Sequence, residues 1–406
     1  MGMPIGFEDI TAAAERIASA VLHSPCPRSV PLSELTGCNI FCKLEYLQRT
    51  GSFKERGARN ALLLLPSEQR KRGVIAASAG NHALGLAYHA RLLEIPVTVV
   101  MPRSAPLTKI SNCRKLGATV LLEGANIDEA RLHAETLIQK RGLTYINGFD
   151  DPAIIAGQGT MGLEILQQVP NLDAIVVPIG GAGLIAGIAL AVKTLSPSVR
   201  IIGVEPERAA SYTAAVEAGK PVKIEMKPTL ADGLSVPMVG GNAFKIARER
   251  VDRTVLVSEH KIAIAVLRLA ELEKAVIEGA GAVPLAACVA GLLPELRGKN
   301  VVLPLCGGNI DMNILGRIIE RGLASDGRLC RFSATISDRP GGLALFAGII
   351  AEEGASILDI YHDRAFASDD ITKVTVHCTV ETRDQEHMQA LHTRLQREGF
   401  EVNSPD

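Results

Sequence analysis

The segment AIVVPIGGAGLIAGIALAV, residues 174–192, decides the fold class of this chain. Ala174 to Pro178 is a short run that is apolar on both faces, which is typical of a strand buried in a parallel sheet. The glycines after it predict a tight turn, and Leu184 to Thr194 has the spacing of a helix. The segment is uncharged and long enough to suggest a membrane span, but its proline and clustered glycines favour a buried strand, turn and helix.

The same alternation of apolar runs and helical patterns extends from about Ile40 to Leu305. Further strands are expected at Gly73–Ala77, Val97–Val100, Ala118–Leu122, Val199–Val204 and Asn300–Leu305. These runs fall into two groups, centred near residues 75–122 and 174–305. The pattern predicts an α/β fold with two lobes of parallel sheet covered by helices, and a cleft between them. The smaller lobe, about residues 48–146, is expected to be inserted in the larger one.

The pattern changes after about Gly322 to short alternating strands and two helices. Strands are expected at Cys330–Ile336, Ser356–Tyr361, Ile371–Val380 and Phe400–Val402, and helices at Leu343–Glu353 and Asp384–Glu398. The order β-α-β-β-α-β predicts a ferredoxin-like domain. We therefore divide the chain into residues 1–322 and 328–406, with a linker within 321–329.

The composition excludes several classes of protein. The 406 residues are 47% hydrophobic and 21% charged with a formal net charge of −1, so a nucleic-acid binder with a basic field is not expected. The first residues show no basic region followed by an apolar run, so no secretory signal is expected. The eight cysteines are scattered without a C-x-x-C pair, which favours reduced thiols and a cytoplasmic enzyme.

Gly180, Gly181, Ala182, Gly183 and Leu184 form the loop between the deciding strand and its helix. Backbone N–H groups at a helix start bind anions, and glycine lets a ligand approach the backbone closely. The loop therefore predicts a phosphate site, against the alternative of a tight turn in the core. It also fits the dinucleotide pattern G-x-G-x-x-A, with Glu205 at the end of the next strand, so a nicotinamide dehydrogenase is a rival interpretation.

Lys54 lies in the stretch Thr50-Gly51-Ser52-Phe53-Lys54-Glu55-Arg56-Gly57. A lysine at a helix start usually points to water. Here Gly51 and Ser52 predict a turn with a helix cap, and Phe53 places an aromatic ring beside the amine. A lysine whose pKa is lowered by burial becomes a nucleophile and base suited to Schiff-base chemistry.

Ser78-Ala79-Gly80-Asn81-His82 follows directly after a predicted strand. Its hydroxyl, amide and backbone donors at a helix start suit a carboxylate. Alone, His82 would be an ordinary packed histidine and Asn81 a helix cap. Because α/β sheets bind ligands at the carboxyl ends of their strands, the block as a whole predicts a site.

These blocks together resemble the fold-type II pyridoxal-phosphate (PLP) enzymes, which share the tryptophan synthase β-like fold, and within them the threonine ammonia-lyases. The likeness covers roughly residues 8–320 and includes further motifs in order along the chain: Ala156-Gly157-Gln158-Gly159-Thr160, Ala231-Asp232-Gly233, Glu278-Gly279-Ala280-Gly281 and Cys306-Gly307-Gly308-Asn309.

The resemblance implies a role for each matched residue. Lys54 would form the Schiff base with PLP, with Phe53 beside it, and would later remove the Cα proton. Asn81 would hydrogen-bond the cofactor's 3′ oxygen, and Cys306 would face the pyridine nitrogen as a neutral partner. The phosphate would be held by the N–H groups of Gly180, Gly181, Ala182, Gly183 and Leu184. The substrate would be held by Ser78, Asn81, His82 and Gly233. The implied reaction converts threonine or serine to a 2-oxo acid and ammonia.

Two relatives of the same fold are alternatives: serine racemases and hydroxyaspartate ammonia-lyases. Racemisation needs an acid or base on each face of Cα, and the racemases have a serine where this chain has Ala79. Racemase-like members also bind a divalent cation through two carboxylates and a carbonyl. Glu205 and Ala209 match two of these ligands, but the second acid aligns with Ser211, so no metal is expected.

The C-terminal unit resembles an ACT domain, an amino-acid-binding module. Its ligand loop would be Asp338-Arg339-Pro340-Gly341-Gly342-Leu343, with Arg339, Pro340, Gly341 and Gly342 as regulatory residues. The hypothesis is feedback control by a branched-chain amino acid, as in isoleucine biosynthesis, in a homodimer or homotetramer. A dimerisation module without a ligand, and a catalytically silent amino-acid sensor, remain alternatives.

Overall fold

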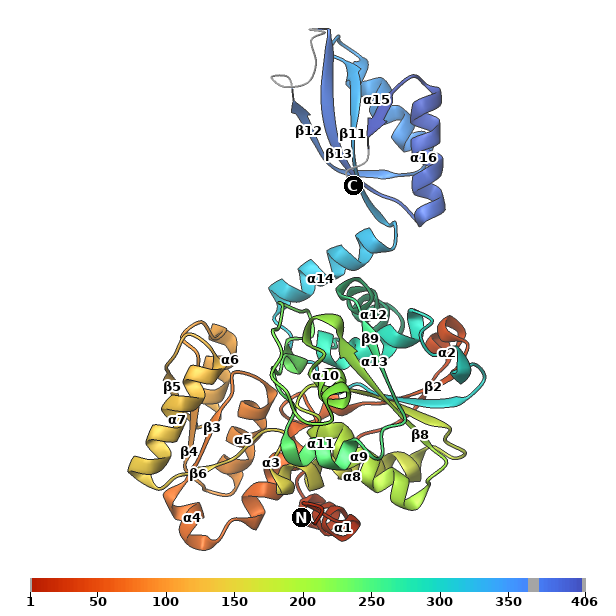
Figure 1. The fold of residues 1–406 in the computed structure, drawn as a ribbon. Helices are drawn as coiled ribbons and strands as arrows, with labels where there is room; N and C mark the ends of the chain where they lie inside the picture. The colour runs from red at the N-terminus through yellow and green to blue at the C-terminus, as the bar shows by residue number, and fades with distance from the viewer. Residues whose placement is uncertain (1, 364–371, 404–406) are drawn as a thin grey trace. The chain divides into compact units, whose positions relative to one another are not determined.

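The computed structural model describes residues 2–363 and 372–403. The chain forms two compact units, residues 1–315 and 316–406 (Figure 1). The division falls inside helix α14 (Met312–Ser325), so the first part of the predicted linker 321–329 is helical. Apolar residues three and four apart, from Met312 to Leu323, explain the helix.

The larger lobe of the first unit is built on a six-stranded sheet of order β1-β2-β10-β7-β8-β9. Its strands are parallel except for the first pair. The strands are β1 (Arg28–Ser29), β2 (Asn39–Lys43), β7 (Ala174–Pro178), β8 (Arg200–Pro206), β9 (Arg253–Val257) and β10 (Asn300–Pro304). The apolar strands β7, β8 and β10 were predicted, whereas β2 and β9 were missed because both carry polar residues.

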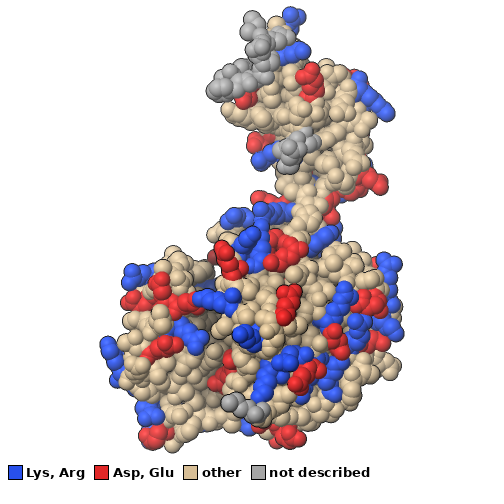
Figure 2. Space-filling view, viewed as in Figure 1, with Lys and Arg blue, Asp and Glu red and all other residues tan. Residues whose placement is uncertain are grey.

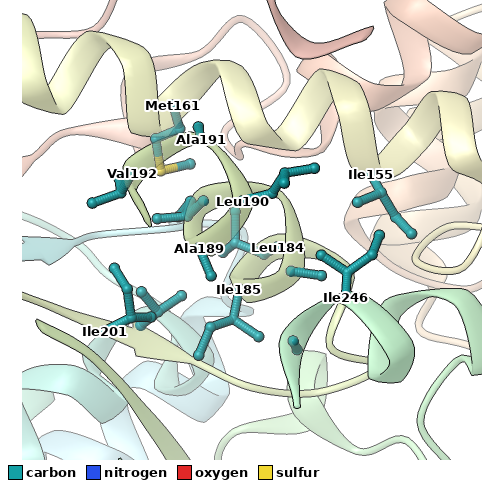
Figure 3. Close-up of a cluster of buried hydrophobic side chains, with 14 of the residues drawn as sticks. Ile155, Met161, Leu184, Ile185, Ala189, Leu190, Ala191, Val192, Ile201 and Ile246 are labelled. Carbon is teal, nitrogen blue, oxygen red and sulfur yellow. The ribbon is translucent and has the colours of Figure 1, made fainter. Parts of the chain in front are cut away.

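Helices cover this sheet and bury its core. They are α1 (Phe7–Ile17), α2 (Val30–Thr36), α8 (Pro152–Gln168), α9 (Gly183–Leu195), α10 (Ser211–Ala218), α11 (Gly241–Ala247), α12 (Glu259–Leu272) and α13 (Gly279–Val289). Helix α9, which begins at the glycine loop, is buried from Gly183 to Val192. Figure 3 shows Leu184, Ile185 and Leu190 of α9 among side chains from α8, β8 and α11. A helix that is apolar all round is buried all round, and this fixes the position of the loop before it.

The smaller lobe is formed by the chain between β2 and β7, around the parallel sheet β5-β4-β3-β6. Its strands are β3 (Val74–Ala77), β4 (Val97–Met101), β5 (Thr119–Leu122) and β6 (Thr144–Tyr145). Its helices are α3 (Lys54–Leu64), α4 (Ser67–Arg72), α5 (Asn81–Leu92), α6 (Leu107–Lys115) and α7 (Ile127–Arg141). Figure 1 shows this sheet with α5, α6 and α7 around it. The predicted two-lobed α/β fold is confirmed.

The second unit contains an antiparallel sheet of order β12-β13-β11-β14 with two helices. Its elements are β11 (Leu329–Ser337), α15 (Gly342–Glu352), β12 (Ser356–Asp363), β13 (Lys373–Glu381), α16 (Gln385–Arg397) and β14 (Glu401–Asn403). Their order is the β-α-β-β-α-β arrangement that the sequence predicted. Ile371, the predicted first residue of the third strand, lies outside the described residues.

Charges of both signs are interspersed on the face in Figure 2. Within residues 2–363 and 372–403, no helix is both long and apolar enough to cross a membrane.

Candidate active site

Lys54 is the first residue of α3, and the segment before the helix is fastened to the end of β10. Ser52 forms a bridge with Gly307, and the Phe53 N–H donates to the Cys306 carbonyl at 3.0 Å. The predicted cap by Ser52 is wrong: Phe53 occupies the N-cap position, and no described residue hydrogen-bonds the buried Ser52 hydroxyl. Strand β10 therefore places Lys54 relative to the larger lobe.

The Lys54 amine is partly buried between a backbone carbonyl and an aromatic ring. Its Nζ donates to the Gly148 carbonyl at 2.8 Å and lies 5.1 Å from the centre of the Phe53 ring. Burial lowers the pKa of Lys54 to about 8, although the neighbouring Cys306 and Glu278 oppose the shift. A large fraction of the amine is therefore neutral just above neutral pH, as a nucleophile or base requires.

The block from Ser78 to His82 connects β3 to α5 at the carboxyl edge of the small sheet. The Ser78 hydroxyl accepts a hydrogen bond from the Gly80 N–H at 3.3 Å. His82 is buried, with Nε2 3.0 Å from the Ile146 carbonyl, and its ring lies against Gly148, where a Cβ would be 2.8 Å from Cγ. Burial and the Lys54 charge lower the pKa of His82 to about 4. His82 is therefore neutral at physiological pH.

Asn81 joins this block to two other segments of the chain. Its Nδ2 donates to Glu278 Oε1 at 2.7 Å, and its Oδ1 accepts from Asn309 Nδ2 at 2.9 Å. Burial and Asp232 raise the pKa of the Glu278 carboxyl to about 7. Glu278 belongs to a motif matched in the sequence, but its place beside Asn81 depends on a contact across 197 positions, which no local pattern indicates.

Cys306 and Gly233 also lie around this cluster. Cys306 is buried, and burial raises the pKa of its thiol well above the usual value, so the thiol is neutral. Gly233 lies in the short helix η3 (Asp232–Leu234), where a Cβ would be 3.1 Å from Ala280 Cβ and 3.7 Å from Glu278 Oε1. The structure thus brings Lys54, Asn81, His82, Cys306 and Gly233 into one region.

The glycine loop is connected to the same region through Phe149, which follows Gly148. A Cβ on Gly181 would be 2.2 Å from the Phe149 ring, and one on Gly183 would be 2.1 Å from its carbonyl oxygen. Ala182 has a left-handed φ of 69° and is the N-cap of α9. Among the described residues, none accepts a hydrogen bond from the N–H groups of Gly180, Gly181, Ala182, Gly183 and Leu184. Donors without an acceptor among the described residues, placed at a helix start, can bind an anion.

Glu205, the weak metal candidate, has a structural use. Its carboxylate is buried at the end of β8 and accepts from the N–H groups of Tyr212 and Thr213 at 2.7 and 2.9 Å, and from the Thr213 hydroxyl at 2.6 Å. These hydrogen bonds satisfy two backbone N–H groups in the first turn of α10. Ala209, the proposed partner of Glu205, ends the short helix η2 (Glu207–Ala209). In the described parts of the chain, no group of three or more His, Cys, Asp or Glu side chains could hold a metal ion.

The predicted regulatory residues lie in the second unit, at the loop between β11 and α15. Arg339, Pro340 and Gly341 line a cavity of about 310 Å³ together with Asp338 and His362. Gly341 has a left-handed φ of 98°, and a Cβ on Gly342 would be 2.1 Å from the Ser337 carbonyl oxygen. Both glycines are therefore required by the shape of this loop.

Comparisons with known proteins agree on one family. The model of the family described as pyridoxal-phosphate dependent enzyme matches residues 17–307. An L-threonine ammonia-lyase of Thermotoga maritima is 44% identical over 398 residues, which are 98% of this chain and 99% of the relative.

Two solved structures extend this result. The processed form of threonine deaminase isoform 2 from Solanum lycopersicum is 39% identical with a TM-score of 0.74, and covers 77% of this chain and 91% of its own. A serine racemase from maize is 33% identical with a TM-score of 0.75, and covers 79% of this chain and 98% of its own. The family match overturns the nicotinamide dehydrogenase interpretation of the glycine loop. The chain belongs to the pyridoxal-phosphate-dependent enzymes of fold type II, in the group that contains the threonine ammonia-lyases.

Proposed function

We propose that this chain is a PLP-dependent L-threonine ammonia-lyase that also accepts L-serine. The observation that carries the proposal is the position of the Lys54 amine, which donates to the Gly148 carbonyl at 2.8 Å and lies beside Phe53 in the same region as Asn81 and Cys306. The full-length likeness to an L-threonine ammonia-lyase supports the substrate class.

The residues present fit the cofactor. The unpaired N–H groups of the glycine loop suit its phosphate, and the unpaired, buried Ser52 hydroxyl is a further free donor near Lys54. Asn81 would hold the ring oxygen, and the neutral Cys306 thiol would face the ring nitrogen. When bound, PLP acts as an electron sink that makes the Cα proton of an amino acid acidic.

Lys54 would move the Cα proton. Its amine is positioned by the Gly148 carbonyl, and partial burial keeps much of it neutral near pH 8. Ser78, Asn81 and His82, with the N-terminus of α5 and Gly233, would hold the substrate carboxylate. Because His82 is neutral, it would act through a hydrogen bond and not through charge.

Ala79 favours elimination over racemisation. Its methyl group packs on the small-lobe core and has no proton to give, so Lys54 would be the only base at Cα. Loss of the Cα proton and the β-hydroxyl gives an enamine. Its hydrolysis takes up the water that elimination released, so threonine becomes 2-oxobutanoate and ammonia, and serine becomes pyruvate and ammonia.

The test is an assay of the purified enzyme, loaded with PLP, on L-threonine, L-serine, threo-3-hydroxyaspartate and their D-isomers. We expect 2-oxo-acid release from L-threonine and L-serine without accumulation of D-isomer. Faster formation of D-serine than of pyruvate would contradict the proposal in favour of a racemase, and release from hydroxyaspartate alone would favour that lyase.

We also infer that residues 328–406 form an ACT-type regulatory domain on a catalytic domain of residues 1–322, whose small lobe spans about 48–146. The cavity beside Arg339, Pro340 and Gly341, with the N-terminus of α15, suits the carboxylate of an amino acid. We propose a branched-chain amino acid as effector, in a homodimer or homotetramer. The eight free cysteines support a cytoplasmic location.

Regulation is tested by titrating isoleucine and valine against the activity of the full chain. The matched variant is Gly341→Val, because valine does not favour the left-handed backbone of this loop. We expect the wild type to respond to one of the two amino acids and the variant to need at least about tenfold more of it. Identical flat curves would reject the effector.

A further inference from the structure

The hydrogen bonds around Asn81 fix the orientation of its amide group. Asn309 Nδ2 donates to the Thr50 carbonyl at 2.6 Å and also to Asn81 Oδ1 at 2.9 Å. Because the Thr50 carbonyl can only accept, this end of Asn309 must be its NH₂ group. The Asn81 atom that faces it must then be the oxygen, and Asn81 Nδ2 points to Glu278 Oε1 at 2.7 Å.

This orientation leaves one donor of Asn81 available. An amide NH₂ group has two N–H donors. Glu278 takes one of them, and no described residue accepts the other from Asn81 Nδ2. The remaining N–H is thus a free donor at the residue that we propose holds the ring oxygen of the cofactor.

The Glu278 side chain accepts a hydrogen bond from Asn81 and does not cap its own helix. Glu278 occupies the N-cap position of α13, where a carboxylate commonly accepts from backbone N–H groups, yet its side chain makes no such bond. Its N–H donates to the Gly307 carbonyl at 3.0 Å. A Cβ on Gly307 would be 2.5 Å from Glu278 Oε1 and 3.1 Å from Asn81 Nδ2. The glycine leaves room for the carboxylate to reach Asn81.

The charged and titratable groups that face Glu278 come from three other elements and from the segment after β10. They are Lys54 of α3, Lys109 of α6, Asp232 of η3 and Cys306 after β10. Lys109 and Asp232 pair with each other at 3.3 Å. Burial and Asp232 raise the pKa of Glu278, while Asn81, Lys109 and Lys54 oppose the shift, and the result is about 7. The charge of Glu278 therefore changes near neutral pH.

We propose that Glu278 and Asn309 are positioning residues, which lock the Asn81 amide from both ends so that its free N–H faces the ring oxygen of bound PLP. Glu278 is the pH-sensitive member of the pair, because its ionised form accepts the stronger hydrogen bond. The inference rests on the proposed function, in which Asn81 touches the cofactor.

The experiment measures PLP binding to the apoenzyme, by absorbance and fluorescence titration, together with the visible spectrum of the holoenzyme. The variants are Glu278→Ala, Glu278→Gln and Asn309→Ala. Glu295→Gln is the matched control, since Glu295 pairs with Arg200 and Arg253 away from this cluster. Each variant is first checked for native circular dichroism.

We expect Glu278→Ala and Asn309→Ala to raise the Kd for PLP about 10- to 100-fold, the range for losing a hydrogen bond to a charged group or leaving a buried amide unpaired. Both should shift the visible absorbance maximum. Glu278→Gln can still accept from Asn81, so its Kd should stay within about threefold of the wild type above pH 8.

The pH dependence separates positioning from a merely structural role. Wild-type Kd should rise as pH falls through about 7, where Glu278 gains its proton. Glu278→Gln should lose this part of the dependence, while ionisation of PLP itself affects both proteins equally. If the two pH curves are the same, the inference is overturned, even if the alanine variants fail to fold.

Folded alanine variants with wild-type Kd and spectrum would overturn it too. Failure of the proposed function looks different, because Lys54→Ala would then keep both the visible band and the activity.

Discussion

Helix α3 carries two basic side chains, Lys54 and Arg56. Arg56 is paired with carboxylates, whereas Lys54 forms no ion pair with a described residue. Arg56 belongs to a buried ion network with Lys43, Glu45 and Glu164. Lys54 belongs to a site cluster with Asn81, Glu278 and Cys306. Because the two cations lie on the same helix, their difference reflects the partners of each.

In the ion network, every charge faces an opposite charge. Arg56 binds Glu45 through two N–H groups at 2.6 and 2.9 Å and Glu164 at 2.6 Å, and Lys43 lies 2.5 Å from Glu164. Burial alone would raise the pKa of Glu45 and lower that of Arg56, but the ion pairs reverse both shifts. Arg56 and Glu45 therefore hold each other in their charged forms, whereas burial still lowers the pKa of Lys43 in the same network.

In the site cluster, no ion pair compensates burial. The pKa of Lys54 falls to about 8 and that of Glu278 rises to about 7, which brings both groups close to neutral pH. Ion pairing keeps Arg56 and Glu45 charged, whereas burial without an ion pair moves the pKa values of Lys54 and Glu278 toward neutral pH.

The largest effect is expected from Lys54→Ala, which removes the reactive amine. Activity on L-threonine should fall by more than about a thousandfold, because both the Schiff base and the base at Cα are lost. The visible absorbance band of the holoenzyme should also disappear. Both are measured on purified protein, with Lys71→Ala as the control for loss of a surface lysine.

Arg56→Met breaks the ion network, because the buried Glu45 carboxylate loses its ion-pair partner and Glu164 is left with Lys43 alone. The free energy of unfolding should fall by about 3–5 kcal/mol, as for one-sided removal of a buried ion pair. Urea unfolding of the apoprotein measures it. The double variant with Glu45→Gln should recover part of the loss. A single variant as stable as the wild type would show that the ion pairs of Arg56 do not stabilise the fold.

Glu278→Gln tests the opposite behaviour in the site cluster. The folded pKa of about 7 lies above the ordinary 4.5, so the stability contributed by Glu278 is complete below pH 4.5 and is lost as pH rises through 7. Glutamine has no such loss. Relative to wild-type apoprotein, the variant should gain about 1 kcal/mol between about pH 6 and 8. Urea unfolding at the two pH values measures this gain. If the stability difference between variant and wild type does not change with pH, the pKa of Glu278 does not lie between about 6 and 8.

Ser52→Ala has the smallest expected effect and sharpens the comparison between paired and unpaired groups. Since no described residue hydrogen-bonds the buried Ser52 hydroxyl, its removal should leave apoprotein stability unchanged or slightly higher. The Kd for PLP should rise about two- to tenfold if the hydroxyl meets the cofactor. Thermal unfolding and PLP titration of one preparation give both values, and a destabilised apoprotein with unchanged Kd would contradict the fit.

In the site cluster, only those residues that lie in a contiguous sequence motif could be predicted from the sequence. Lys54, Asn81 and the glycine loop each follow a recognisable local pattern, as do the apolar strands β7 and β10. The Gly148 carbonyl, which lies 94 positions from Lys54, belongs to no such pattern.

The ion network could not be predicted at all. Lys43 and Arg56 meet Glu164 across 121 and 108 positions. Charged residues in a sequence are expected at the surface, and only the packing of β2, α3 and α8 pairs them inside. The helical start of the predicted linker was missed because residues 321–325 contain one large apolar residue, Leu323, together with a glycine and small side chains.

The role of Lys54 is tested most directly by reducing the holoenzyme with borohydride, digesting it and locating the modified residue by mass spectrometry. We expect a pyridoxyl group on Lys54 and on no other lysine. A label on a different lysine, or PLP that is released unreduced from a fully active enzyme, would contradict this role.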